Sequence, residues 1–134
     1  MPTLLEPISI TSATFSLTKD HLAGGEIFLN RAGGIAMTLP APDAGLSARI
    51  IVGTSPTTDC TISSAGGADI IVVSVNELET DTGDDGPYDD NADVVTFKAN
   101  VALVGDFLVV SCDGTKWYMQ GQTNADGAIT TGTT

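Results

Sequence analysis

Basic residues are scarce in this 134-residue sequence, which holds five Lys and Arg against 17 Asp and Glu and has a formal net charge of −12. Nucleic-acid binding needs a basic patch that neutralises phosphates. Anionic membrane surfaces likewise attract basic segments. The composition therefore argues against both kinds of partner, and we expect no nucleic acid and no membrane contact.

Long apolar runs are also lacking. The longest, Ile70–Val73 and Val101–Val104, have the length of a strand and fall far short of the ~20 residues of a membrane helix. No base precedes Lys19 and no apolar core occupies the first twenty residues, so we expect no secretory signal. A chain of this length is expected to form one domain.

Reactive side chains are few. Cys60, Cys112 and the single histidine, His21, are too few for a zinc site. Buried free thiols are the favoured interpretation of the cysteines, with a disulfide as the alternative. No G-x-S-x-G element accompanies His21, and no aromatic groove accompanies the acids. We therefore predict no enzyme, no catalytic residue and no cofactor.

Small, β-branched and turn-forming residues dominate what is present, whereas good helix formers are scarce. Eight to ten short strands are expected, with turns every eight to twelve residues. This spacing is typical of an all-β fold, an antiparallel β-sandwich or jelly roll. We place the sandwich domain at residues 13–121.

Residues 26–52 are the clearest strand pattern. Gly33-Gly34 is expected to turn the chain between two strands, after which apolar residues alternate up to Leu39. Pro40-Ala41-Pro42 ends that strand, because proline donates no ladder hydrogen bond. A third strand follows at Ser47–Val52. We interpret the three strands as one sheet unit and the bend after Leu39 as a passage between the sheets of a sandwich.

Further strands are expected along the chain, at residues 13–18, 60–64, 69–75, 94–98, 101–104, 107–112 and 116–120. The Asp113-Gly114 pair between two apolar runs predicts a hairpin. Trp117 and Tyr118 are neighbours on that hairpin and must point to opposite faces, so at most one of them serves the core.

Both ends of the chain are expected to extend from the domain. Residues 1–12 are interpreted as an N-terminal arm that docks on its own domain or on a neighbour, although a first strand at Ile8–Ile10 is an equal alternative. The arm is apolar, and its candidate residues for contact with a capsid or a neighbouring subunit are Leu4, Leu5, Ile8 and Ile10. Residues 122–134 are polar and are predicted to be a flexible tail.

Residues 76–93 hold eight of the 17 acids and no base. Gly83, Gly86 and Pro87 argue against a regular element, so we expect a long exposed loop. A calcium loop that begins at Asp81 matches in part, with Asp85 and Asp89 as further candidate ligands, but the position of the bidentate glutamate is Ala92. A solvated loop without metal is the favoured interpretation.

Three segments together resemble a known family. They are GIAMTLPAP with GLSARIIV at residues 34–52, TDCTI with GGADII at residues 58–71, and DGTKWYMQG at residues 113–121. In order and spacing they resemble tailed-phage capsid decoration (cement) proteins, and next to these the modules of phage head fibres and tail fibres.

The resemblance implies a β-sandwich or jelly roll that forms a homotrimer on the outer surface of a phage head. Its partner would be the major capsid protein, its location the virion after synthesis in the host cytoplasm, and its role the stabilisation of the head. A receptor- or glycan-binding module of a fibre is the alternative, with Tyr88, Trp117 or Tyr118 expected in a groove.

Overall fold

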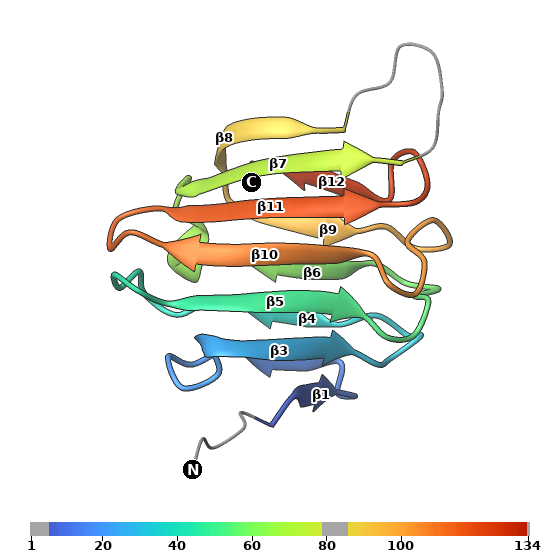
Figure 1. The fold of residues 1–134 in the computed structure, drawn as a ribbon, viewed down its shortest axis with the longest axis horizontal. Helices are drawn as coiled ribbons and strands as arrows, with labels where there is room; N and C mark the ends of the chain where they lie inside the picture. The colour runs from blue at the N-terminus through green and yellow to red at the C-terminus, as the bar shows by residue number, and fades with distance from the viewer. Residues whose placement is uncertain (1–5, 79–85, 134) are drawn as a thin grey trace.

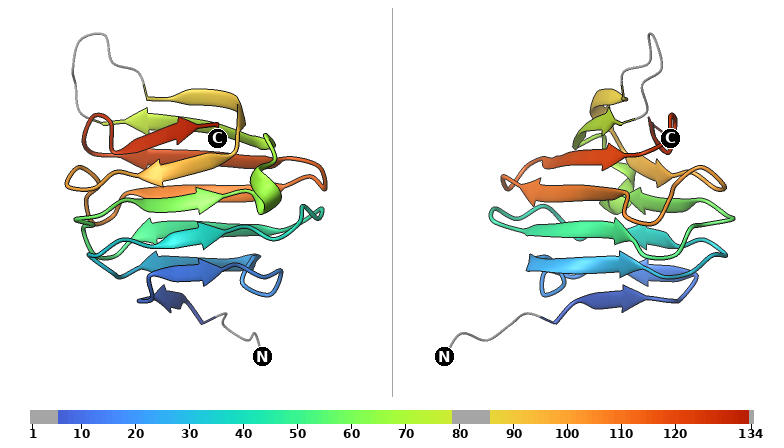
Figure 2. Two further views of the ribbon diagram at one scale, coloured as in Figure 1. Left: turned by 180° about the vertical axis from the view of Figure 1, so that it is seen from behind. Right: turned by 45° about the vertical axis from the view of Figure 1, so that its right-hand side comes forward.

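The computed structural model describes residues 6–78 and 86–133, which fold into two β-sheets packed face to face (Figures 1 and 2). The described residues contain twelve strands and one 3-10 turn at Ala65–Gly67. The strands are β1 Ile8–Ile10, β2 Thr14–Ser16, β3 Ala23–Leu29, β4 Ala36–Thr38, β5 Ser47–Val52, β6 Cys60–Ser63, β7 Ile71–Glu77, β8 Tyr88–Ala92, β9 Val94–Phe97, β10 Phe107–Cys112, β11 Trp117–Thr123 and β12 Ile129–Gly132. The all-β prediction is confirmed.

The large sheet has the strand order β1-β3-β5-β10-β11-β7-β8, and the small sheet has the order β12-β9-β6-β4-β2. From β1 to β6 the chain alternates between the sheets, so each strand lies parallel to the strand two before it. The first half of the chain therefore winds in successive turns, and each turn contributes one strand to each sheet (Figure 1).

Both sheets are mixed, which corrects the expectation of antiparallel pairing. Of the ten strand pairs in the described residues, five are parallel. The antiparallel prediction holds where β10 pairs with β5 and β11, and in three further pairs. A jelly roll is built from antiparallel strands. The jelly-roll prediction is therefore not confirmed.

The turn at Gly33-Gly34 explains the difference. Gly34 has φ +87°, and a Cβ there would lie 2.7 Å from the Asp59 carbonyl oxygen, so the position requires glycine. The turn does not fold β3 and β4 into a hairpin. It carries the chain to the small sheet, where β4 pairs with β6, so residues 26–52 are not one sheet unit. The passage between sheets predicted after Leu39 is confirmed, because β5 lies in the large sheet.

Two predicted elements of the second half of the chain have opposite outcomes. The Asp113-Gly114 hairpin joins β10 to β11 as predicted. The apolar run at residues 101–104 forms no strand, and Leu103 and Val104 are exposed in the loop before β10. Instead the run begins in turns, because the backbone N–H groups of Val101 and Ala102 donate to the Lys98 carbonyl.

The predicted tail and acidic loop are corrected as well. Residues 122–134 are not a flexible tail, because β11 extends to Thr123 and β12 pairs with β9. The loop at residues 76–93 is shorter than predicted, since β7 continues to Glu77 and Tyr88–Ala92 forms β8 at the sheet edge. Residues 79–85 lie outside the described part.

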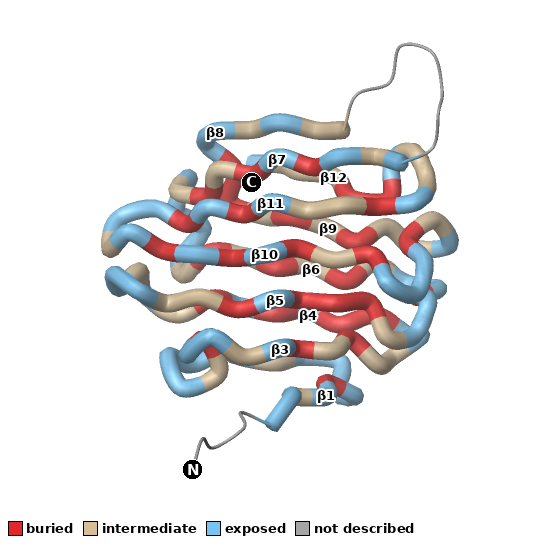
Figure 3. The backbone as a smooth tube through the Cα atoms, in the orientation of Figure 1, coloured by how far each residue is buried: buried red, intermediate tan, exposed pale blue. Residues whose placement is uncertain are grey.

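The core lies between the two sheets, where alternate residues of the strands are buried (Figure 3). Trp117 and Phe97 are its largest fully buried side chains. Cys60 and Cys112 are buried free thiols, which confirms the favoured interpretation. At the chain start the alternative of a first strand is confirmed, because β1 pairs with β3.

Candidate functional site

The predicted contact residues of the N-terminal segment fall into three environments. Leu4 and Leu5 lie outside the described residues. Ile8 is half-buried at the sheet edge, whereas Ile10 is only 1% exposed and packs in the core. A contact of Ile10 with a capsid or neighbour is therefore wrong, because its side chain already belongs to the domain.

Of the three candidate calcium ligands, Asp89 alone lies in the part of the chain that the structure describes. Asp81 and Asp85 lie outside the described residues. Asp89 lies on β8, where its carboxylate accepts hydrogen bonds from Thr131 Oγ1 at 3.0 Å and from the backbone N–H of Asn91 at 3.0 Å. Within residues 6–78 and 86–133 no group of three His, Cys, Asp or Glu side chains is placed to hold a metal ion.

His21 lies in the turn between β2 and β3. Its Nδ1 accepts the backbone N–H of Thr18 at 2.9 Å, and its ring lies tilted against the Phe15 ring, with 5.0 Å between the centroids. These contacts hold the turn over the end of the core. The Thr18 hydroxyl lies 3.1 Å from the same Nδ1, and among the hydrogen bonds of the described chain none places an acid on this ring to orient it.

The outer face of the large sheet carries three of the six exposed large apolar side chains of the described residues, Tyr88, Val109 and Tyr118. Along its strands, outward side chains alternate with core residues, and the strand register aligns them in rows. In one row Phe28, Ile51 and Phe107 are direct neighbours. We call this surface the apolar face. Its apolar members are the exposed Tyr88, Val109 and Tyr118, the half-buried Phe28, Val72 and Phe107, and Ile51, which points to the same side but is only 8% exposed.

Two opposite charges lie on the apolar face. Glu26 and Arg49 are exposed and directly opposite each other on β3 and β5. The Arg49 guanidinium lies over the Phe107 ring, 4.7 Å from its centroid. The ion pairs of the described chain lie elsewhere, at Lys19–Asp43 and Lys98–Asp59. Among the described residues, Glu26 and Arg49 are thus adjacent but form no ion pair with each other.

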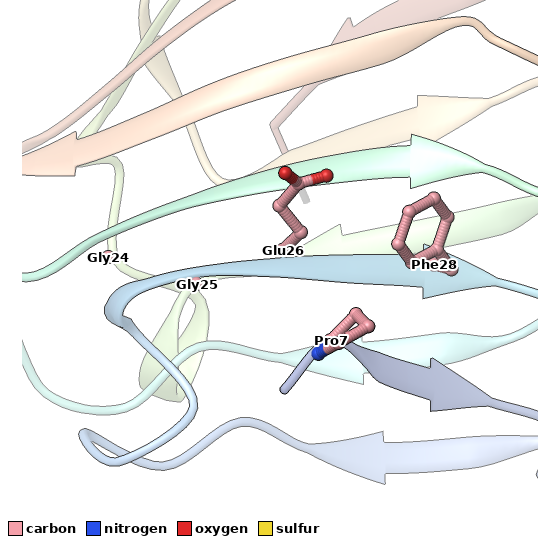
Figure 4. Close-up of a pocket in the computed structure, with 5 residues that line it drawn as sticks. All are labelled: Pro7, Gly24, Gly25, Glu26 and Phe28. Carbon is pink, nitrogen blue, oxygen red and sulfur yellow. The ribbon is translucent and has the colours of Figure 1, made fainter. Parts of the chain in front are cut away.

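A hollow of about 410 Å³ lies at the β1 end of the apolar face (Figure 4). A Cβ at Gly25 would meet nothing within 4 Å, so the missing side chains leave this space open. A second hollow of about 310 Å³ adjoins it and extends to Arg49 and Val109. The residues that line the first hollow are Pro7, Gly24, Gly25, Glu26 and Phe28.

The outer face of the small sheet has a different chemistry. None of its five strands contains a charged residue, although the chain carries 17 acids. The register aligns Thr61 with Thr96 and Thr96 with Thr130. We call this surface the hydroxyl face. Its outward hydroxyl side chains are Thr14, Ser16, Thr38, Thr61, Ser63, Thr96 and Thr130.

The hairpin between β10 and β11 separates the two aromatic candidates. Trp117 is fully buried, so its expected place in a groove is wrong. Tyr118 is 41% exposed on the apolar face, and its hydroxyl donates to the Asp113 carboxylate at 3.3 Å. Backbone N–H groups of Lys116 and Thr115 lower the pKa of Asp113 to about 2, and its charge raises the pKa of Tyr118.

Sequence reasoning did not identify Glu26, Arg49 and Phe28 as one surface. The available signal was the alternation of these residues with apolar ones in two strands. That pattern shows which residues point outward, but not that β3 and β5 are neighbours, because β4 lies between them in the sequence.

No family model, curated protein or solved structure matches the chain. Across residues 6–78 and 86–133, no helix has the length and apolar character needed to cross a membrane.

Proposed function

We propose that the chain is a structural virion protein, a capsid decoration protein that binds the outer surface of a phage head as a homotrimer and stabilises it. The observation that carries this proposal is the apolar face. An exposed surface with aromatic rings on rigid strands suits contact with other protein subunits. The partner proposed for the assembled trimer is the major capsid protein.

The arrangement of charge supports an orientation on the head. The strands at one end of the stack, β1 and β2, contain no charged residue, whereas β8 at the opposite end contains Asp89 and Asp90. An uncharged edge strand can pair with a strand of another protein, and acids on an edge discourage such pairing. The β1 end, which follows Leu4 and Leu5, is therefore proposed to face the capsid, and the acidic end to face outward.

Cosedimentation with phage heads tests this function. Purified protein would be mixed with heads stripped of accessory proteins, and bound protein measured after centrifugation. We expect saturable binding and DNA retention at a higher temperature. A variant lacking residues 1–5 should bind more weakly, whereas Thr38→Arg on the hydroxyl face should bind as the parent does. Absence of the protein from heads at any concentration would contradict the proposal.

A fibre module that binds a receptor or glycan is the second candidate. It is favoured by one observation, the exposure of Tyr88 and Tyr118, at 70% and 41%, on the same sheet face. Exposed aromatic rings can stack on sugars. A glycan array tests this candidate: binding that is lost in Tyr118→Ala would support it, and an array without hits would count against it.

A further inference from the structure

We propose that copies of this chain bind one another through the apolar face, with Arg49 of one copy paired to Glu26 of the next. This inference rests on the homo-oligomer of the proposed function and names the surface that forms it. It starts from two opposite charges that lie side by side and leave each other unpaired.

The position of Arg49 makes it available to a second molecule. Of the four other bases, Lys19 and Lys98 pair with acids, Arg31 donates to the Gly34 carbonyl at 2.7 Å, and Lys116 is exposed at the β10–β11 hairpin, away from Glu26. Arg49 is held over the Phe107 ring, which fixes its side chain but satisfies no carboxylate. A guanidinium fixed in this way can form a two-pronged contact with a carboxylate from another copy.

The surroundings of Glu26 provide space for that contact. Glu26 lines both hollows. In the first of them the neighbouring Gly24 and Gly25 add no side chains beside it (Figure 4). A projecting group of a second copy can enter there without displacing any part of the fold. Val109, which is 45% exposed beside Arg49, is such a projecting apolar group on the same face.

The size and charge of the face fit a second copy of the chain. Seven strands about 4.8 Å apart, each up to about 20 Å long, give a face of roughly 600 Å². A stable interface buries about 800 Å² per partner, so this face can supply most of one. Each copy has a net charge of −12, and a contact between copies avoids strong repulsion where one acid and one base cancel.

The short distance between Glu26 and Arg49 within one copy also indicates where the symmetry axis of the oligomer would lie. Because Glu26 and Arg49 are register partners on adjacent strands, a rotation axis that passes close to them brings each Arg49 near a Glu26 of another copy. The homotrimer of the proposed function requires a threefold axis. A twofold axis would satisfy the same pairing, so the measured mass distinguishes the two arrangements.

Charge reversal tests the inference on the full chain. Light scattering coupled to gel filtration and sedimentation equilibrium would compare the parent with Glu26→Arg, Arg49→Glu and the double variant. We expect an oligomeric parent, a dissociation constant raised about tenfold or more in each single variant, and recovery in the double variant, where the pair is reversed.

Matched controls separate the face from general effects of charge. Thr38→Arg and Thr38→Glu place the same charges on the hydroxyl face and should leave association unchanged. Gly25→Leu fills the first hollow without changing charge and should weaken association. Far-ultraviolet circular dichroism and urea unfolding would verify that every variant is folded.

Each outcome decides between the two proposals. A monomeric parent, or an oligomer that neither single variant weakens, overturns this inference. Recovery of association in the double variant supports the Arg49–Glu26 contact, because a variant that had merely lost its fold would not recover. Binding to heads by a parent that self-associates through another surface would leave the decoration function standing and reject this face. Self-association through this face without binding to heads would support this inference and reject the decoration function.

Discussion

At the scale of single residues, Trp117 has the largest side chain fully buried between the sheets, and its indole Nε1–H has no hydrogen-bond partner among the described residues. Trp117→Ala is expected to lower the free energy of unfolding by about 3–5 kcal/mol, because it leaves a large cavity. Trp117→Phe should cost about half of that or less, since it keeps the ring contacts and removes an unsatisfied donor. Urea unfolding followed by circular dichroism measures both, and equal costs would contradict the packing described.

Asp113 is the residue whose titration is tied most clearly to local structure. Its carboxylate accepts the backbone N–H groups of Thr115 and Lys116, each at 2.8 Å, and its pKa falls from the ordinary 3.8 to about 2. Because the folded pKa lies below the unfolded value, charged Asp113 stabilises the hairpin above pH 3.8. This contribution is lost as the pH falls from there toward about 2.

The prediction is that Asp113→Asn is less stable than the parent at neutral pH and that the difference shrinks as the pH falls toward about 2. The same change removes the charge that raises the pKa of Tyr118, so phenolate absorbance should report a lower pKa for one tyrosine. Carboxyl carbon shifts in NMR would measure Asp113 directly. A carboxyl that titrates at its ordinary value would refute the assignment.

At the scale of elements, the sequence predicted most strands of the fold but not their partners. Alternating β-branched residues and turn residues locate β5, β6, β10 and β11 closely, because these signals are local. Pairing is not local: β4 lies between β3 and β5 in sequence, yet these two pair in parallel across the large sheet. A glycine turn such as Gly33-Gly34 looks the same whether it closes a hairpin or crosses to another sheet.

The site was less predictable than the fold for the same reason. The apolar face joins residues from β3, β5, β10, β11, β7 and β8, and only the register brings Glu26 beside Arg49. The prediction of a flexible tail at residues 122–134 is wrong, because it was based on a polar, Thr-rich composition that is typical of tails. Two buried side chains, Ala128 and Ile129, are enough to hold this segment against β9.

The strand β12 is therefore expected to contribute to stability. Ile129 is 1% exposed, so Ile129→Ala should lower the free energy of unfolding by about 2–5 kcal/mol. Thr133→Ala, at an exposed position beyond the strand, is the control and should change stability by no more than about 0.5 kcal/mol. Equal stability of Ile129→Ala and the parent in urea would mean that the segment does not pack on the core.

At the scale of the whole molecule, the charge imbalance governs how stability responds to salt. The net charge is −12, and the two ion pairs of the described chain are both solvent-accessible. Salt therefore screens much repulsion and removes little attraction. We expect the urea midpoint and the thermal midpoint to rise between low and moderate ionic strength, in contrast to a protein stabilised by surface ion pairs.

Asp90 supplies a matched variant for this prediction, because it is an exposed acid on the edge strand β8. Asp90→Asn removes one negative charge and should stabilise the fold by a few tenths of a kcal/mol at low salt and by nothing measurable at high salt. The measurement is urea unfolding at two potassium chloride concentrations, at one fixed protein concentration, because self-association raises apparent stability. If salt lowers the midpoint, or if Asp90→Asn acts equally at both concentrations, repulsion does not dominate the electrostatics of the folded chain.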